Sequence, residues 1–123
     1  MQDITPALAA NAQLIQSYGP GGFRIGNADY ATSVLVTLTA TFPWNGELTL
    51  EALAPILESG PIDILLLGTG ARHEMLDPAL RRVLRERVNG IDTMDTGAAC
   101  RTFNVLLGEG RLAAAALVLP VRP

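Results

Sequence analysis

IDTMDTGAACRTFNVLLGEGRLAAAALVL, residues 91–119, is the stretch that decides the fold. Its first five residues follow a turn-forming Asn-Gly pair and predict a short buried strand. Thr96 is expected to cap the next helix, because its hydroxyl can accept a hydrogen bond from one of the first helical N–H groups. One apolar face at helical spacing follows, formed by Ala99, Phe103, Leu106 and Leu107. A glycine-bounded turn and an apolar run complete a predicted strand–helix–strand unit.

A second strand–helix pair precedes this unit. Residues 62–67, IDILLL, form a near-continuous apolar run, which is typical of a strand buried on both faces. An Asp-Pro pair at 77–78 begins a helix, and its buried stripe is predicted to hold Leu80, Val83, Leu84 and Val88. From residue 62 onward the order is therefore strand, helix, strand, helix, strand. Right-handed crossovers make such strands parallel, with the helices packed on the sheet.

The first third of the chain predicts an antiparallel meander. Apolar residues alternate with threonines along its last strand, as on a sheet with one partly solvated face. The meander either supplies a second β layer or extends the first sheet. Between turns rich in glycine, strands are expected at 14–18, 23–25 and 30–41.

A break and a helix are expected after the meander. Residues 42–46, FPWNG, should interrupt the sheet. Thr49 then caps a helix that Pro55 should kink or delay, because proline removes a backbone donor and clashes with the preceding turn. We expect residues 1–12 to be a loosely ordered terminus and residues 13–123 to form a single α/β domain.

The composition is that of a folded globular protein. Hydrophobic residues make up 49% of the 123 residues and charged residues only 17%, which excludes a disordered chain. The net charge is −3, and every basic residue other than the single histidine is arginine. No basic run has the pattern that nucleic-acid binding requires, so we expect no nucleic-acid partner.

The single cysteine excludes an intramolecular disulfide and a multi-cysteine zinc site. We expect neither a metal nor a cofactor. No basic residue precedes Arg24, so the start of the chain lacks the positive region of a signal or transit peptide. No apolar run approaches the roughly 20 residues that span a bilayer. We expect a soluble, cytoplasmic protein without a transmembrane segment.

Two strand-to-helix junctions are the best candidates for a site. Ligands of parallel sheets bind beyond the carboxyl ends of the strands, where diverging connections open a crevice. One junction is Gly68-Thr69-Gly70 and the other is Asp95-Thr96-Gly97-Ala98. Free N–H groups at the start of the second helix could hold an anion, and Arg72 and Arg101 lie within plausible reach.

Structural interpretations compete with each of these site roles. The glycines of GTGARH permit tight turning and close packing, and His73 stands where a dinucleotide fingerprint needs its third glycine. Thr96 can serve as a plain helix cap. Arg101 can form a structural salt bridge to Asp95 or Glu109. We identify no catalytic set.

Three further residues carry potential chemistry. Cys100 can be a nucleophile near a helix N-terminus, but its position also fits the buried stripe, where free cysteines are common. His73, the only histidine, lies in a polar loop and is expected to be exposed. Asp63 lies in an apolar strand, where a carboxylate must be paired or at the sheet edge.

Several segments resemble one family. SYGPGGFRIG, the GTG after IDILLL, LDPALRRVL and above all MDTGAACRTFNVLLGEGRLAAAALV resemble the uncharacterised domain family typified by the adipogenesis-associated domain protein. The mitochondrial member of this family is complex I (NADH:ubiquinone oxidoreductase) assembly factor 3. The resemblance covers residues 12–119 and implies a three-layer β/β/α fold.

The resemblance also implies a role and a set of site residues. Most bacterial members have no assigned activity, whereas the mitochondrial member works without catalysis, together with a partner, in building complex I. For this chain it implies a bacterial assembly or adaptor protein. By the same resemblance, Gly68, Thr69, Gly70, Thr96, Arg101 and Asn104 line the crevice, and Glu109 and Arg111 support it.

Two hypotheses about function therefore remain open. The first is a protein-interaction module, with respiratory-complex assembly components as partners and with Phe42 and Trp44 as candidate contacts in a loop. For Trp44, the competing interpretation is an anchor tucked into the core. The second is a binder of, or enzyme acting on, a small anion or metabolite at the GTG and Thr96 junctions. The sequence does not specify the oligomeric state.

Overall fold

Eight strands and three helices are described in the computed structural model, which covers residues 13–121. The expected loose terminus at 1–12 lies outside the described residues. In chain order the elements are β1 (Ile15–Gly19), β2 (Gly22–Ile25), β3 (Ala28–Tyr30), β4 (Ser33–Val36), β5 (Thr41–Trp44), α2 (Leu50–Leu57), β6 (Ile64–Gly68), α3 (Pro78–Arg85), β7 (Gly90–Met94), α4 (Thr96–Gly108) and β8 (Ala113–Leu117).

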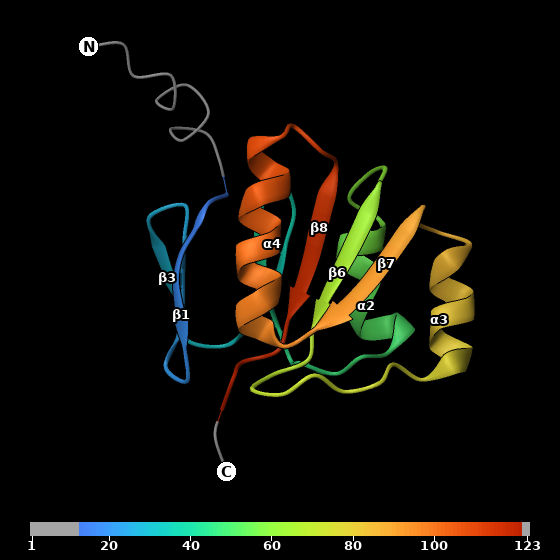
Figure 1. The fold of residues 1–123 in the computed structure, drawn as a ribbon, viewed down its shortest axis with the longest axis horizontal. Helices are drawn as coiled ribbons and strands as arrows, with labels where there is room; N and C mark the ends of the chain where they lie inside the picture. Colours follow the sequence, from blue (N-terminus) through green and yellow to red (C-terminus); the bar gives the residue numbers. More distant parts are fainter. Residues whose placement is uncertain (1–12, 122–123) are drawn as a thin grey trace.

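The strands form two sheets (Figure 1). A five-stranded sheet has the order β5-β4-β8-β6-β7, and a three-stranded sheet has the order β1-β2-β3. β6 is parallel to both β7 and β8, whereas β4 is antiparallel to β8 and to β5. The predicted parallel strand–helix–strand–helix–strand unit is confirmed. The N-terminal third supplies a second β layer and also extends the main sheet.

The expected strand at 30–41 is divided among three strands. Its first residue ends β3, its middle forms β4, and its last residue begins β5. The division at residue 37 has a local cause, because the Thr37 hydroxyl accepts hydrogen bonds from the N–H groups of Thr39 and Ala40. Such a side-chain bond offers the backbone a turn in place of a continuing ladder.

Phe42, Pro43 and Trp44 do not break the sheet. They form most of β5, which pairs with β4 at one edge of the five-stranded sheet. Proline is tolerated there because an edge strand leaves one side of its backbone unpaired. The prediction that residues 42–44 interrupt the sheet as a loop is therefore wrong.

The helix caps differ in part from expectation. The Thr49 side chain accepts a hydrogen bond from the Ala52 N–H, as predicted. α2 begins directly after Thr49, so of the two expected effects of Pro55, a kink or a late start, the late start does not occur. At α4 the cap is Asp95, whose carboxylate accepts a hydrogen bond from the Ala98 N–H at 2.9 Å. Thr96 is the first residue of α4 instead of its cap.

The connections place helices on both faces of the main sheet. The chain moves from β6 to β7 through α3 and then returns past β6 to β8 through α4. Because both crossovers are right-handed by rule, reversing the direction puts the two helices on opposite faces. α2 and α3 cover one face, and α4 with the three-stranded sheet covers the other.

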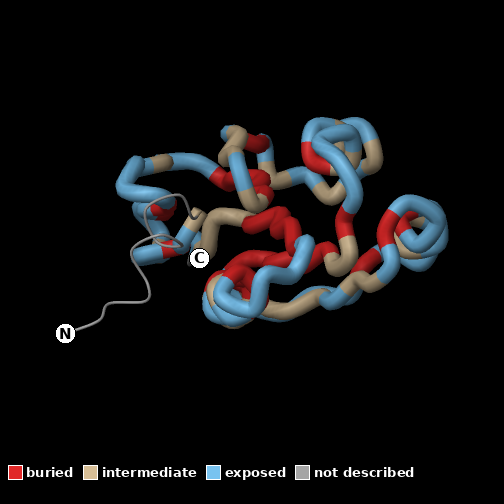
Figure 2. Tube along the Cα trace, turned by 90° about the horizontal axis from the view of Figure 1, so that it is seen from above, coloured by how far each residue is buried: buried red, intermediate tan, exposed pale blue. Residues whose placement is uncertain are grey.

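The core lies on both sides of the five-stranded sheet (Figure 2). The alanine run of β8 is buried throughout, and its small side chains let the layers on either face pack close to the central strand. Leu53, Ile56 and Leu84 fill one face. Phe103 of α4 and Phe23 of β2 fill the other. The chain is thus a layered α/β domain, as the sequence predicts.

Asp63 is paired at the end of β6 that lies away from the GTG turn. Its carboxylate accepts hydrogen bonds from the Arg111 guanidinium at 3.0 Å and from the Asn89 amide at 3.3 Å. These two hydrogen bonds, with Arg111 contributing most, hold the pKa of Asp63 below its usual value. The prediction that this carboxylate must be paired is confirmed.

Replacing this carboxylate should change the acid response of the fold. A lowered folded-state pKa gives stability that is present above the unfolded pKa and is lost as the pH falls through the folded value, here below about pH 4. Asp63→Asn should therefore show a shallower loss of unfolding free energy over that range, measured by urea denaturation at several pH values. Asp92→Asn, at an exposed residue of β7, is the control. Identical acid limbs for Asp63→Asn and the wild type would contradict the assignment.

Candidate functional site

The topology opens a crevice beyond the carboxyl end of β6. The neighbours of β6 are reached by connections that leave in opposite directions, one through α3 and one through α4. Ligand sites in open α/β sheets form at such a switch point. The turn that follows β6 there is Thr69-Gly70, and it faces the start of α4.

Thr96 joins the three elements that meet at this point. Its side chain is fully buried. The hydroxyl accepts a hydrogen bond from the Gly70 N–H at 2.9 Å and donates one to the Val118 carbonyl at 2.6 Å. The Thr96 N–H donates to the Gly70 carbonyl at 2.8 Å. Both functions of the hydroxyl are therefore engaged inside the fold, and the predicted role of Thr96 in holding an anion is not supported by its surroundings.

The Thr69 hydroxyl is likewise engaged in hydrogen bonds inside the fold. Its hydroxyl accepts a hydrogen bond from the Glu74 N–H at 2.9 Å and lies 2.7 Å from the Arg72 carbonyl, to which it can donate. The side chain is buried. These bonds shape the loop between β6 and α3 instead of presenting a hydroxyl to a ligand.

The glycines of the GTG turn serve close packing and turning. A Cβ on Gly68 would lie 3.0 Å from the Thr96 Cα and 3.1 Å from the Ala99 Cβ, so α4 approaches β6 too closely for a larger residue. Gly70 has a φ of +107°, a conformation that favours glycine. The structure therefore supports the interpretation in which these glycines permit tight turning and close packing.

Two adjoining pockets nevertheless lie over the turn. The first has a volume of about 310 Å³ and lies between the β1–β2 hairpin tip, the turn and the start of α4. The second, of about 340 Å³, lies between the turn and the segment that leaves β8. Both pockets are lined by Gly70 and Ala71. We call this end of the molecule the strand-end surface, defined by Tyr18, Pro20, Ala71, Met75, Pro120 and Val121.

Tyr18 and Arg101 form one wall of the first pocket. Arg101 donates a hydrogen bond to the Tyr18 hydroxyl. The Tyr18 ring lies against Gly97, where a Cβ would come within 2.9 Å of the ring. Among the described residues Arg101 makes no ion pair with Asp95 or Glu109, so of its two interpretations the structural salt bridge is not observed, and Arg101 lines the pocket. Arg101 instead fixes the hairpin tip to α4.

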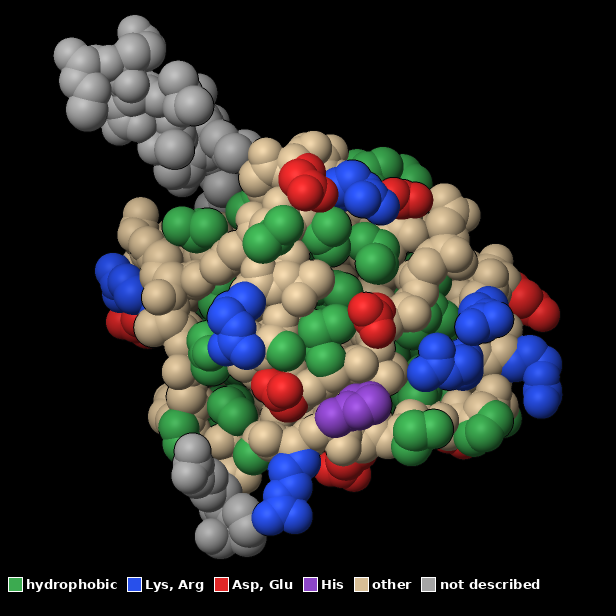
Figure 3. Space-filling view, in the orientation of Figure 1, with side chains coloured by type: hydrophobic (Ala, Val, Ile, Leu, Met, Phe, Trp, Pro, Cys, Tyr) green, Lys and Arg blue, Asp and Glu red, His purple; other side chains and the backbone are tan. Residues whose placement is uncertain are grey.

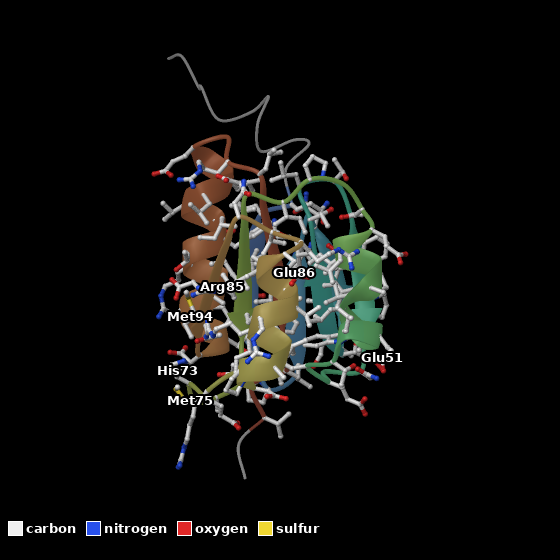
Figure 4. The ribbon with its side chains drawn as sticks, turned by 90° about the vertical axis from the view of Figure 1, so that its right-hand side faces the viewer. Glu51, His73, Met75, Arg85, Glu86 and Met94 are labelled. Atoms are coloured by element: carbon white, nitrogen blue, oxygen red, sulfur yellow. The ribbon has the colours of Figure 1, made fainter. Side chains whose placement is uncertain are left out.

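The strand-end surface exposes large apolar side chains. Met75 is 87% exposed, Val121 58% and Tyr18 41%. Met75 stands on the loop after the turn and, with His73, projects at the lower end of the view in Figure 4. His73 is exposed, as expected, and its Nε2 lies 2.9 Å from the Thr93 hydroxyl. Tyr18 lines the first pocket and Val121 the second, and Met75 follows Glu74, which also lines the second pocket.

Asn104 is not in the crevice. Its amide accepts a hydrogen bond from the Ile15 N–H and donates one to the Ile15 carbonyl, both at 2.9 Å. It thereby pairs with the backbone of β1 as a neighbouring strand would, and fastens the three-stranded sheet to α4. The crevice role implied for Asn104 is wrong.

The two residues expected to support the crevice lie elsewhere. Arg111 forms an ion pair with Asp63 at 3.0 Å, close to the start of β6, whereas the crevice is at the strand's other end. Glu109 is the C-cap of α4, and its backbone N–H donates to the last turn. Both support the fold, but neither borders the two pockets.

Cys100 is a core residue. It is buried in the cluster between α4 and the sheet, and burial raises the pKa of its thiol to about 12. A nucleophilic cysteine needs an accessible sulfur and a lowered pKa. The hypothesis of thiol chemistry at Cys100 is therefore wrong.

Of the two proposed interaction residues, Trp44 is buried. It packs with α2 and the sheet, and Phe42 is half-buried beside the same cluster. For Trp44 the interpretation as a core anchor is the one that the structure supports. Its indole N–H has no hydrogen-bond partner in the described part of the chain. A part for Phe42 in partner contacts stays a prediction.

Sequence reasoning missed the residues that form the strand-end surface. Tyr18, Met75 and Val121 come from three segments that are distant in sequence, and no motif links them. One local signal was present. Gly97 lies in the first turn of a helix, where almost any other residue would stabilise the helix more than glycine does, so the glycine indicates a close approach by another part of the chain. Because Gly97 has no Cβ, the Tyr18 ring can pack directly against the helix backbone.

Neither a metal site nor a membrane span is found in the part of the chain that the structure describes. Residues 13–121 contain no group of three or more His, Cys, Asp or Glu side chains placed to hold an ion. No helix in that range has both the length and the apolar character that crossing a bilayer demands.

Comparison with known proteins identifies the chain's relatives. An uncharacterised protein of Rhodobacter capsulatus is 39% identical over 109 residues, which cover 89% of this chain and 86% of that protein. The NADH dehydrogenase (ubiquinone) 1 alpha subcomplex assembly factor 3 of Danio rerio is 38% identical over 117 residues, covering 91% of this chain and 67% of the relative. Several other animal assembly factors 3 match at 31–36% identity, and the chain spans about 59–64% of their length.

Solved structures agree with this relationship. A crystal structure described as an outer membrane protein from Bartonella henselae superposes with a TM-score of 0.80 at 38% identity, covering 89% of this chain and 97% of that one. A solution structure of a Rhodopseudomonas palustris protein gives a TM-score of 0.75 at 34% identity, covering 89% and 84%. The family match spans residues 15–118, the whole of both sheets. The chain belongs to the family described as proteins of unknown function, DUF498/DUF598.

Proposed function

We propose that this protein is a non-catalytic assembly factor that binds a partner protein at its strand-end surface. The partner is a component of respiratory complex I, and the protein acts from the cytoplasm, the location that the sequence predicts. The observation that carries the proposal is the exposure of Tyr18 and Val121 at two pockets that share Gly70 and Ala71, together with the exposure of Met75 on the loop next to Glu74, which lines the second pocket.

The names of the relatives support the identity of the partner. The animal relatives that match over most of this chain are named as assembly factors of NADH dehydrogenase. This chain spans about two thirds of the length of the zebrafish protein. The shared part is 91% of this chain, so a role that belongs to this domain of the zebrafish protein can also belong to this chain.

The chemistry of the surface favours protein binding over binding of a small anion. The Thr69 and Thr96 hydroxyls are satisfied inside the fold. The first pocket is lined by Asp95 as well as by Arg101, so an anion bound there would lie close to a negatively charged residue as well as a positively charged one. Exposed apolar side chains gain free energy when a protein partner removes them from water, at about 25 cal/mol per Å² of apolar surface.

Site-specific crosslinking tests the proposal. A photoreactive amino acid in place of Met75 should capture a complex I subunit or a second assembly protein in the native host, identified by mass spectrometry. Val105, which is 60% exposed on α4, is the matched control position and should not capture it. Capture of the same protein from both positions, or of none from Met75, would count against the strand-end surface as the contact.

A further inference from the structure

A second surface lies on the other side of the molecule from α4. α2 and α3 cover the same face of the five-stranded sheet, because Leu53 and Ile56 of α2 share one apolar cluster with Leu84 of α3. Figure 4 shows the two helices side by side, with Glu51 extending from α2 and Arg85 from α3. We call this surface the helix face, defined by residues 47–58 and 78–87.

The two helices of the helix face carry charges of opposite sign, with acidic residues on and around α2 and mainly basic residues on α3. Residues 47–58 carry Glu47, Glu51 and Glu58 and no basic residue, so their net charge is −3. Residues 81–87 carry four arginines and one glutamate, so their net charge is +3. Figure 3 shows basic side chains gathered over the side of the molecule that carries α3. Two neighbouring helices therefore present stripes of opposite sign and equal magnitude.

These charges do not neutralise each other within the protomer. The ion pairs found among the described residues are Arg24–Asp29 and Arg111–Asp63, and neither lies on the helix face. A groove of about 240 Å³ lies between the acidic helix and Arg87, and it is lined by Leu50, Ala54 and Leu57 together with Glu51 and Glu58. Val83 of α3 is also 38% exposed. The face thus combines unpaired charges with a partly apolar groove.

The pattern of signs selects the kind of partner. A partner of uniform negative charge, such as a nucleic acid or an anionic membrane, is attracted by α3 and repelled by α2 at the same time. A partner that matches both stripes must carry a basic stripe opposite α2 and an acidic stripe opposite α3. A second copy of this chain, turned by a two-fold rotation about the groove, presents these stripes in that order.

We propose that the helix face is the interface of a two-fold symmetric dimer, in which α2 of each protomer lies against α3 of its partner. The contact is isologous, so each attraction between a glutamate of α2 and an arginine of α3 occurs twice. Helices of eight residues are only about 12 Å long, which makes the interface small. The dimer is therefore weak and depends on salt, since exposed charges are screened beyond about 3 Å in 1 M salt.

Analytical ultracentrifugation over a concentration series tests the dimer. The wild type should dimerise at low salt and dissociate at high salt. E51R/E58R makes both stripes basic and R82E/R85E makes both acidic, so each variant alone should be monomeric, with a dissociation constant raised on the order of a hundredfold because every reversal counts twice. The control R24E lies on β2, away from the helix face, and should leave the dimer unchanged.

Mixing the two variants gives the decisive outcome. At one contact of the mixed dimer, the acidic α3 of R82E/R85E faces the basic α2 of E51R/E58R. At the other contact, the unaltered acidic α2 of R82E/R85E faces the unaltered basic α3 of E51R/E58R. The mixture should restore a heterodimer, which also shows that both variants are folded. A wild type that is monomeric throughout the series, a dimer that survives either reversal, or a mixture that stays monomeric would each overturn the proposal.

Discussion

Thr96→Val should lower the free energy of unfolding by about 2–5 kcal/mol. Valine keeps the shape of the side chain but removes the hydroxyl that accepts from the Gly70 N–H and donates to the Val118 carbonyl. The Gly70 N–H and the Val118 carbonyl then lose their hydrogen-bond partner beside a fully buried side chain. Each unsatisfied buried polar group costs about 1–3 kcal/mol. Urea denaturation followed by circular dichroism measures the loss.

A threonine on the same helix provides the matched control. Thr102 is half-buried, and the one hydrogen bond that its hydroxyl makes with the described residues is to the Met94 sulfur, at 3.6 Å, so Thr102→Val should change stability by less than about 1 kcal/mol. Thr96→Ser keeps the hydroxyl and should recover much of the loss. Hydrogen exchange at the Gly70 amide should quicken in Thr96→Val alone. Equal stability of the two valine variants would contradict the role assigned to Thr96.

Gly22→Ala should destabilise the protein by about 3–5 kcal/mol. Gly22 has a φ of +134°, and a Cβ there would lie 2.0 Å from the Tyr30 carbonyl oxygen. Strained backbone and overpacking each cost about 1–3 kcal/mol, and neither can relax here without separating β2 from β3. The loss of unfolding free energy is again measured with urea.

The neighbouring glycine is the control for this variant. A Cβ on Gly21 would have no heavy atom within 4 Å, and Gly21 does not have a positive φ. Gly21→Ala should therefore leave stability unchanged or raise it by up to about 1 kcal/mol, because alanine restricts the unfolded chain. If both alanine variants lost stability equally, the clash with Tyr30 would not be the cause.

The C-terminal half of the fold was predictable because its signals are local. An apolar run such as IDILLL is buried on both faces, and alternation of strands and helices forces parallel pairing, which β6, β7 and β8 show. The N-terminal half was predicted less well. Whether the chain continues or turns at Thr37 depends on two hydrogen bonds to one side chain, and a Pro43 at a sheet edge cannot be told from one in a loop by sequence alone.

The crevice and part of its lining were located from sequence. Thr69, Gly70 and Arg101 line the two pockets, whereas Gly68, Thr96 and Asn104 do not. The strand-to-helix junctions follow from the alternation of strands and helices, and Gly70 lies at one of them. The strand order, with β6 between β8 and β7, was not predicted. A sequence does not show which hydroxyls are engaged in internal hydrogen bonds, so it cannot distinguish a Thr69 or Thr96 that binds a ligand from one that stabilises the fold. The exposed Met75, Val121 and Tyr18 are brought together only by tertiary structure.

The two proposed surfaces are independent of each other. The strand-end surface is formed by turns beyond the ends of β6 and β8, whereas the helix face is formed by the sides of α2 and α3. A dimer through the helix face therefore leaves both strand-end surfaces accessible. It would present two partner-binding ends related by the two-fold axis.

Complementation of a strain that lacks this protein tests the central claim most directly. The amount of assembled complex I, measured on blue-native gels, should fall in that strain and return with the wild type and with the control Val105→Asp. M75D/V121D, which places charges on the strand-end surface at residues whose side chains are mostly exposed, should fold normally and fail to restore complex I. Full restoration by M75D/V121D, or a normal level of complex I in the deletion strain, would contradict the account.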